Sequence, residues 1–127
     1  MINQSLKKKK IIISAGASGI GLATAKVCLS RGAYVYLCDI DNKSLNKLNK
    51  HSLKNKRLFT FHCDASDESQ VSDLFKKILK KTKKIDALIN NVGIAGPTGS
   101  LEKLNSKDWE KTIQVDVNSH FYFTKRA

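Results

Sequence analysis

The sequence lacks features that define several classes of protein. It has no signal peptide and no apolar run long enough to span a bilayer, so we expect no membrane partner. Its cysteines form no Cys-x-x-Cys pair and are an odd number, which fits free, mostly buried thiols in a reducing cytoplasm (Cys28, Cys38, Cys63). The histidines share no metal-like spacing, so we predict no metal site (His51, His62, His120).

Arginine is scarce although the formal net charge is +12, since all but three of the 23 basic residues are lysine. Arginine suits bidentate contacts to phosphates and bases, whereas lysine is a solvated point charge. No aromatic residues alternate with the lysines as a stacking platform for single strands would require. We therefore predict solvated helix faces and no nucleic-acid partner. A basic nucleic-acid-binding protein is the alternative, and it rests on charge alone.

Neither the Gly-x-Gly-x-x-Gly dinucleotide fingerprint nor the Gly-Lys-Ser/Thr of a P-loop is present. Instead, residues 11–13 read as a strand buried on both faces, a turn of small residues follows, and residues 19–30 have a helical period. A strand, a glycine-rich turn and a helix N-terminus together form an anion-binding site. Spacing places five residues on one face of this helix (Ile20, Ala23, Thr24, Val27, Cys28).

At 127 residues the chain supports one domain, in which strands and helices alternate. The further strands are predicted at residues 33–38, 57–63 and 85–90. Helices are predicted over residues 41–53, after a cap at Ser66 or Asp67, and from about Ser106. The helix after the cap should bury one apolar face (Val71, Leu74, Phe75, Ile78, Leu79). This alternation predicts an α/β fold, a Rossmann-type doubly wound parallel sheet with strand order 3-2-1-4.

Asp39 closes the second predicted strand, about 20 residues after the glycine turn. A Rossmann unit places there the carboxylate that accepts hydrogen bonds from the adenosine ribose. A negative charge at this point also repels a 2′-phosphate, so NAD is favoured over NADP. The alternative is that residues 39–42 only cap the next helix.

Several motifs now resemble the short-chain dehydrogenase/reductase family. The string Ser14-Ala15-x-x-x-Gly19-x-Gly21 resembles the family's Thr-Gly-x-x-x-Gly-x-Gly, and Asn90-Asn91-Val92-Gly93 resembles its Asn-Asn-Ala-Gly. Ala15 and Val92 depart from the family pattern by added bulk. The chain is identified as the N-terminal, cofactor-binding portion of a member of this family.

The resemblance implies a basic N-terminal lead at residues 1–9 and an NAD(P)-binding Rossmann domain at residues 10–127, truncated before strand five. It also implies that the cofactor is NAD, with NADP the lesser expectation. The residues implied to bind the cofactor follow the ends of the four strands (Ser14, Gly16, Ser18, Gly19, Ile20, Gly21, Asp39, Ile40, Asp64, Ala65, Asn91, Val92, Gly93).

The family transfers a hydride between NAD(P) and an alcohol or carbonyl by means of a Ser, a Tyr-x-x-x-Lys and an Asn. No Tyr-x-x-x-Lys occurs in this chain, and we expect the 127 residues alone to be inactive. Counted from Trp109, the catalytic Asn position falls on Asp116, with Asn118 the alternative. The intact parent should be a homo-oligomeric NAD-dependent oxidoreductase with an alcohol or carbonyl substrate. A non-catalytic nucleotide-binding half-domain is the other interpretation.

Overall fold

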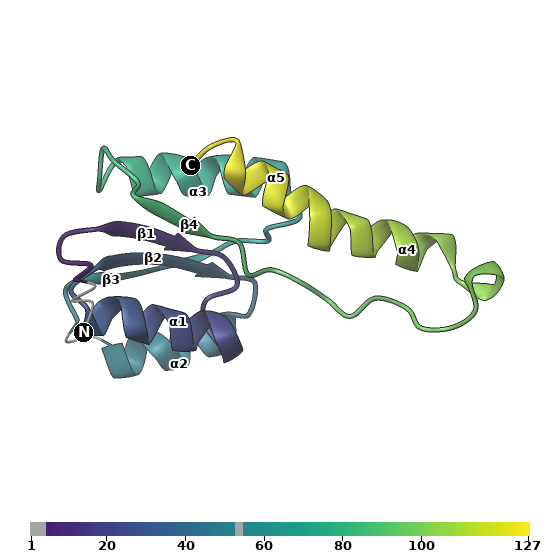
Figure 1. The fold of residues 1–127 in the computed structure, drawn as a ribbon, viewed down its shortest axis with the longest axis horizontal. Coiled ribbons are helices and arrows are strands. Elements are labelled where there is room, and N and C mark those ends of the chain that lie inside the picture. The colour runs from purple at the N-terminus through teal and green to yellow at the C-terminus, as the bar shows by residue number, and fades with distance from the viewer. Residues whose placement is uncertain (1–4, 53–54) are drawn as a thin grey trace.

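The computed structural model describes residues 5–52 and 55–127. Its centre is a parallel sheet of four strands in the order β3-β2-β1-β4, which confirms the predicted topology. Figure 1 shows the strands side by side with helices on both faces. In chain order the strands are β1 Lys10–Ile13, β2 Tyr34–Asp39, β3 Leu58–His62 and β4 Ala87–Ile89.

Helices α1 (Gly19–Ser30) and α2 (Asn42–Ser52) cover one face of the sheet, and α3 (Glu68–Leu79) and α5 (Ser119–Thr124) cover the other (Figure 1). Because β1 lies between two strands and two helical layers, its three isoleucines are buried on both faces, as predicted (Ile11, Ile12, Ile13). Alternate residues of the strands supply two separate apolar cores, one under each helical layer.

The buried face of α1 differs from the predicted one. Ile20 and Val27 are exposed, at 79% and 50%, whereas the helix packs on the sheet through Gly21, Ala25 and Cys28. Small residues face the sheet because α1 approaches the strands closely, and of the large side chains of this helix only Leu29, near its C-terminal end, is buried. Of the five residues predicted on the inner face only Cys28 is buried, so the prediction from periodicity was wrong for the other four.

Helix α3 follows its predicted pattern more closely. Asp67 is the N-cap, and its carboxylate accepts from the amides of Ser69 and Gln70. Four of the five residues predicted on the inner face are buried, but Leu79 is 48% exposed, because it lies at the last residue of the helix. The first amides of a helix have no hydrogen-bond acceptor within the helix, and the Asp67 carboxylate supplies one to two of them.

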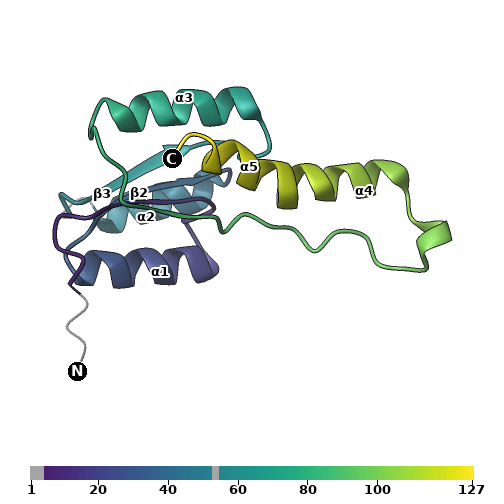
Figure 2. The ribbon, with the colours of Figure 1, turned by 45° about the horizontal axis from the view of Figure 1, so that its top comes forward.

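The C-terminal segment is a long arm. It contains the 3-10 helix η1 (Leu101–Lys103), α4 (Ser106–Ile113), the π-helical segment η2 (Gln114–Asn118) and α5. Figures 1 and 2 show that α5 lies beside α3 while α4 extends away from the sheet. Four large apolar side chains spaced by four residues along α4, η2 and α5 are exposed (Trp109, Ile113, Val117, Phe121), as is Leu101 in η1.

The remaining differences from the predicted elements are small. The second strand begins at Tyr34 instead of Ala33, and β3 and β4 are each shorter than predicted. The predicted end of the second helix at Leu53, and the first four residues of the predicted N-terminal lead, lie outside the described residues. In the part of the chain that the structure describes, no helix is both long and apolar enough to cross a bilayer.

Candidate nucleotide-binding site

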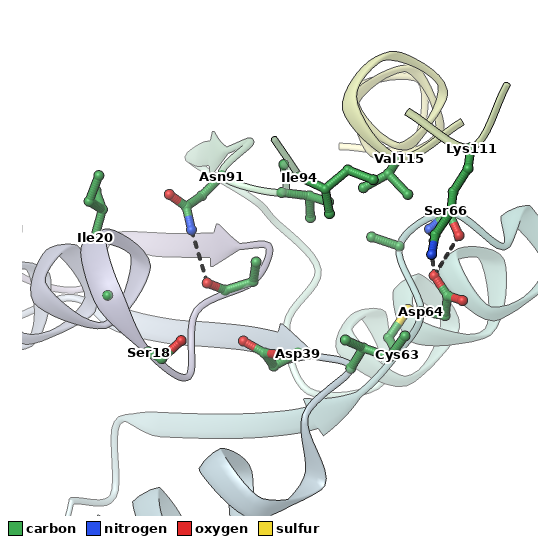
Figure 3. A pocket seen from close by; sticks show the side chains of 16 residues that line it. Ser18, Ile20, Asp39, Cys63, Asp64, Ser66, Asn91, Ile94, Lys111 and Val115 are labelled. Carbon is green, nitrogen blue, oxygen red and sulfur yellow. Dashed lines mark hydrogen bonds between the residues drawn. The ribbon is translucent and has the colours of Figure 1, made fainter. Parts of the chain in front are cut away.

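A cavity of about 590 Å³ opens at the carboxyl ends of the four strands (Figure 3). This is the edge at which open parallel α/β sheets bind ligands, and the volume is in the range of small-molecule sites. Ten of the thirteen residues predicted to bind a cofactor line it (Ser18, Gly19, Ile20, Asp39, Ile40, Asp64, Ala65, Asn91, Val92, Gly93).

The turn between β1 and α1 forms the first wall of the cavity. Ser18 is the N-cap of α1, but its side chain makes no capping hydrogen bond, and no acidic residue stands in the first helical turn. The first-turn amides are therefore left for an anion, which the helix dipole also favours. Ala15 adopts a left-handed backbone with φ of 49°, where the family motif has glycine.

Three predicted site residues lie beneath this wall and support it. The Ser14 hydroxyl accepts from the amide of Asn91 at 3.0 Å, which joins the ends of β1 and β4. A Cβ on Gly16 would lie 2.8 Å from the Cβ of Leu37. A Cβ on Gly21 would lie 2.4 Å from the Ala15 carbonyl oxygen. Both glycines are therefore required by close packing.

Asp39 stands at the end of β2 and is 9% exposed. Its Oδ2 accepts from the amide of Ala17 at 3.0 Å, and its Oδ1 accepts from the amide of Asp41 at 3.0 Å. An ionised carboxylate has about four acceptor positions, so each oxygen can accept one more hydrogen bond. Asp39 thus fixes the glycine-rich turn and still presents an acceptor to the cavity (Figure 3).

The segment after β3 forms the far end of the cavity. Asp64 turns its Oδ1 back to accept from both the amide and the hydroxyl of Ser66, at 2.9 and 2.7 Å. Beneath it, the thiol of Cys38 donates to the sulfur of Cys63, which raises the pKa of Cys38 and lowers that of Cys63. Both cysteines are buried and free, as predicted.

The segment after β4 is tied to the rest of the sheet by its asparagines. Asn91 donates from Nδ2 to the Ala15 carbonyl at 2.9 Å, and Asn90 donates from Nδ2 to the Thr124 hydroxyl at 3.1 Å. The other side-chain atom of Asn90, Oδ1, is buried and has no hydrogen-bond partner among the described residues. These bonds hold the backbone at Val92 and Gly93 along the cavity.

Asp116 contacts this same segment, whereas Asn118 does not. The Oδ1 of Asp116 accepts from the amide of Ile94 at 2.8 Å, while Asn118 donates to the side chain of Gln114. One helical turn later, a ring nitrogen of His120 lies 2.9 Å from the Val92 carbonyl oxygen. Asp116 therefore contacts the segment that follows β4, but it does not line the cavity.

Sequence reasoning missed six residues that line the cavity (Ala15, Cys63, Ser66, Ile94, Lys111, Val115). The first four adjoin predicted site residues and could have been found by extending each strand end by one position. Lys111 and Val115 come from the C-terminal arm, and no local pattern indicates that this arm folds back over the sheet. Among the described residues, no group of histidine, cysteine and acidic side chains could hold a metal ion.

Comparison with known proteins agrees with this geometry. The family profile described as short chain dehydrogenase matches residues 9–127. The CLA biosynthesis dehydrogenase/reductase of Lactiplantibacillus plantarum is 33% identical over 125 residues, which cover 98% of this chain and 43% of that protein. The 15-hydroxyprostaglandin dehydrogenase of Bos taurus, whose name specifies NAD(+), is 34% identical over 115 residues, covering 87% of this chain and 40% of that protein.

Solved structures share the fold. The structure of ElxO with NADP bound superimposes with a TM-score of 0.85 and 26% sequence identity, over 94% of this chain and 48% of that one. The chain thus spans less than half the length of these relatives. A profile match over nearly every residue, together with the sheet order and the motifs at the strand ends, gives one conclusion. The chain belongs to the short chain dehydrogenase family.

Proposed function

We propose that this chain forms the cofactor-binding part of an NAD-dependent oxidoreductase, which transfers a hydride between the nicotinamide and an alcohol or carbonyl substrate. The observation that carries the proposal is the pairing of an uncapped helix N-terminus with the Asp39 carboxylate in one cavity. The first suits a pyrophosphate, and the second suits ribose hydroxyls. Residues 10–127 would make up this domain, with residues 1–9 as its basic lead.

The predicted residues take distinct roles in this proposal. Ser18, Gly19 and Ile20 face the pyrophosphate, Asp39 and Ile40 face the adenosine ribose, and Asp64 with Ala65 faces the adenine. Asn91, Val92 and Gly93 line the path toward the nicotinamide, while Ser14, Gly16 and Gly21 hold the turn. Asp116 stands in for the family's asparagine. Bound NAD would supply the hydride acceptor, and these residues would bind and orient it.

Relatives of this chain include proteins described with NAD(+) and with NADP, so the choice of cofactor depends on local residues. Asp39 carries a negative charge in the cavity wall, and among the described residues no arginine lines the cavity to hold a 2′-phosphate. Both features favour NAD over NADP.

Binding of NADH and NADPH to Asp39→Asn tests this role. The wild-type chain should bind NADH more tightly, and the substitution should reduce that preference about tenfold or more, because a hydrogen bond to a charged group is worth about 1.5–3 kcal/mol. Asp41→Asn is the matched control, since Asp41 is a neighbouring carboxylate that caps the next helix and does not line the cavity. Equal affinity of the wild-type chain for both cofactors would contradict the assignment.

A second function is a nucleotide-binding half-domain without chemistry of its own. The observation that favours it is that the printed sequence contains no Tyr-x-x-x-Lys. A coupled assay of the purified chain with NAD and a panel of secondary alcohols separates turnover from binding. Binding without turnover is the expected result for these 127 residues, because general acid–base catalysis alone contributes about 10²–10⁴-fold.

Assembly and compartment complete the proposal. The exposed apolar stripe on the arm fits an interface in a homo-oligomer, because four large apolar side chains follow one another at helical spacing. Three free cysteines, all buried, fit a reducing compartment such as the cytoplasm. Sedimentation of the purified chain checks the first expectation, and a strictly monomeric species would contradict it.

A further inference from the structure

Lys111 is the one basic side chain among the described residues that line the cavity. It comes from α4, on the arm, and Figure 3 shows its side chain directed toward Ser66 and Asp64 at the far end of the cavity. Two carboxylates, Asp39 and Asp64, line the same cavity. Lys111 therefore places a positive charge in a site whose other charged groups are negative.

The position of Lys111 is fixed by its neighbours on the arm. Gln114, three residues later on the same helical run, donates from Nε2 to the Ser66 carbonyl at 2.6 Å. Glu68, at the start of α3, accepts from Lys125 and Arg126 at 2.7 and 2.9 Å. These contacts hold the arm over the segment after β3. The backbone at Lys111 can therefore move away from the cavity only if these hydrogen bonds and ion pairs break.

Lys111 and Asp64 do not neutralise each other. No hydrogen bond or ion pair joins the side chain of Lys111 to another of the described residues, and Asp64 uses its Oδ1 for Ser66. The Oδ2 of Asp64 has no partner among the described residues. A cationic donor and an anionic acceptor thus line the same cavity without forming an ion pair with each other.

We propose that Lys111 is a specificity-determining residue that recognises the adenine of the cofactor together with Asp64. Adenine presents an amino group as donor beside ring nitrogens that only accept. Asp64 can accept from the amino group, while the Lys111 ammonium donates to a ring nitrogen or lies over the ring face. This inference rests on the proposed function, because it assumes that the adenine end of NAD occupies this end of the cavity.

The test compares Lys111→Met with the wild-type chain by NMR titration of AMP and of ribose 5-phosphate. Methionine keeps most of the apolar stem and removes the charge. We expect the substitution to weaken AMP binding about three- to tenfold, as for one hydrogen bond from a charged group at a partly exposed site, and to leave ribose 5-phosphate binding unchanged. Lys107→Met is the matched control, since Lys107 lies one turn earlier on α4 and does not line the cavity.

Three outcomes of these titrations would overturn the inference about Lys111. Unchanged AMP binding by Lys111→Met would overturn the inference and leave the proposed function intact. Equal weakening of AMP and ribose 5-phosphate would also overturn it, because Lys111 would then act on the phosphate. Failure of the wild-type chain to bind both AMP and NAD would overturn the proposed function and this inference together.

Discussion

The sheet and the C-terminal arm are stabilised in different ways. Four parallel strands and their helices bury most of the apolar side chains, and β1 and β2 are almost completely enclosed. The arm buries no residue of α4 and leaves its apolar stripe exposed, yet it supplies Asp116, Lys111 and Val115 to the neighbourhood of the site. Apolar burial therefore forms the framework, and a few polar contacts, together with the buried Phe123 of α5, position the part of the arm that completes the cavity.

The sheet and the arm should differ most in how much free energy of unfolding is lost when one large side chain is truncated. Leu37 in β2 is fully buried and packs against the turn at Gly16, whereas Phe121 on the arm is 59% exposed. Leu37→Ala should lower the free energy of unfolding by about 2–5 kcal/mol, because it removes apolar contacts and leaves a cavity. Phe121→Ala should change it by less than about 0.5 kcal/mol. Urea unfolding measures both, and equal losses would contradict the comparison.

A second prediction concerns strain within the framework. Ala15 has φ of 49°, which an L-residue adopts at a cost of roughly 1–2 kcal/mol. Ala15→Gly should therefore raise the free energy of unfolding by about 0.5–1 kcal/mol, the remainder being lost to the greater freedom of glycine in the unfolded chain. Gly19→Ala makes the opposite change at φ of 52°. None of the described residues would lie within 4 Å of the added Cβ, so only the backbone conformation opposes the substitution, which should destabilise the chain by a similar amount. A lower melting temperature for Ala15→Gly would contradict this account.

The smallest expected effect is on the pH dependence of stability. Asp86, just before β4, accepts from the amide of Lys10 and pairs with Lys84, which lowers the pKa of its carboxyl to about 2. A carboxyl whose pKa is lower in the folded chain contributes stability above its unfolded pKa of about 3.9. That contribution is lost as the pH falls toward 2. In thermal melts from pH 5 to pH 2, the melting temperature of Asp86→Asn should fall less steeply with pH than that of the wild-type chain. Identical dependence of the two melting temperatures on pH would contradict the prediction.

Sequence reasoning predicted the framework better than the arm, for physical reasons. Strand positions follow from β-branched runs between turn residues, and the sheet order follows from the alternation of strands and helices. The face of α1 was predicted wrongly because close packing selects small residues such as Ala25, which a search for bulky periodicity overlooks. Lys111 was missed because it lines the same cavity as the segment after β3 although the two lie about 45 residues apart in the chain.

The site was predictable where it follows a strand. Asp39 and Asn91 are both at strand ends, and chain position alone brings such residues to one edge of a parallel sheet. How each side chain divides its hydrogen bonds could not be predicted. Asp39 also accepts a hydrogen bond from the amide of Ala17. This bond depends on the path of the turn, which is set by packing at Gly16 and Gly21.

The π-helical segment Gln114–Asn118 also has a consequence for how the arm can evolve. The amide of Ser119 bonds to the carbonyl of Gln114, five residues earlier, so this turn holds one residue more than an α-helix would. Deleting one residue here would restore a regular α-helix and leave the residues after it on nearly the same faces, because the five-residue π turn carries the chain about as far around the axis as four residues of α-helix. Phe123, which is fully buried against Phe75, would then keep this contact, whereas a deletion between Ser119 and Phe123 in α5 would rotate Phe123 by about 100° away from the core. We therefore expect a one-residue deletion to be tolerated within this turn but not within α5, and the fluorescence or ring-current shifts of the two deletion variants would show whether the Phe123 contact is lost.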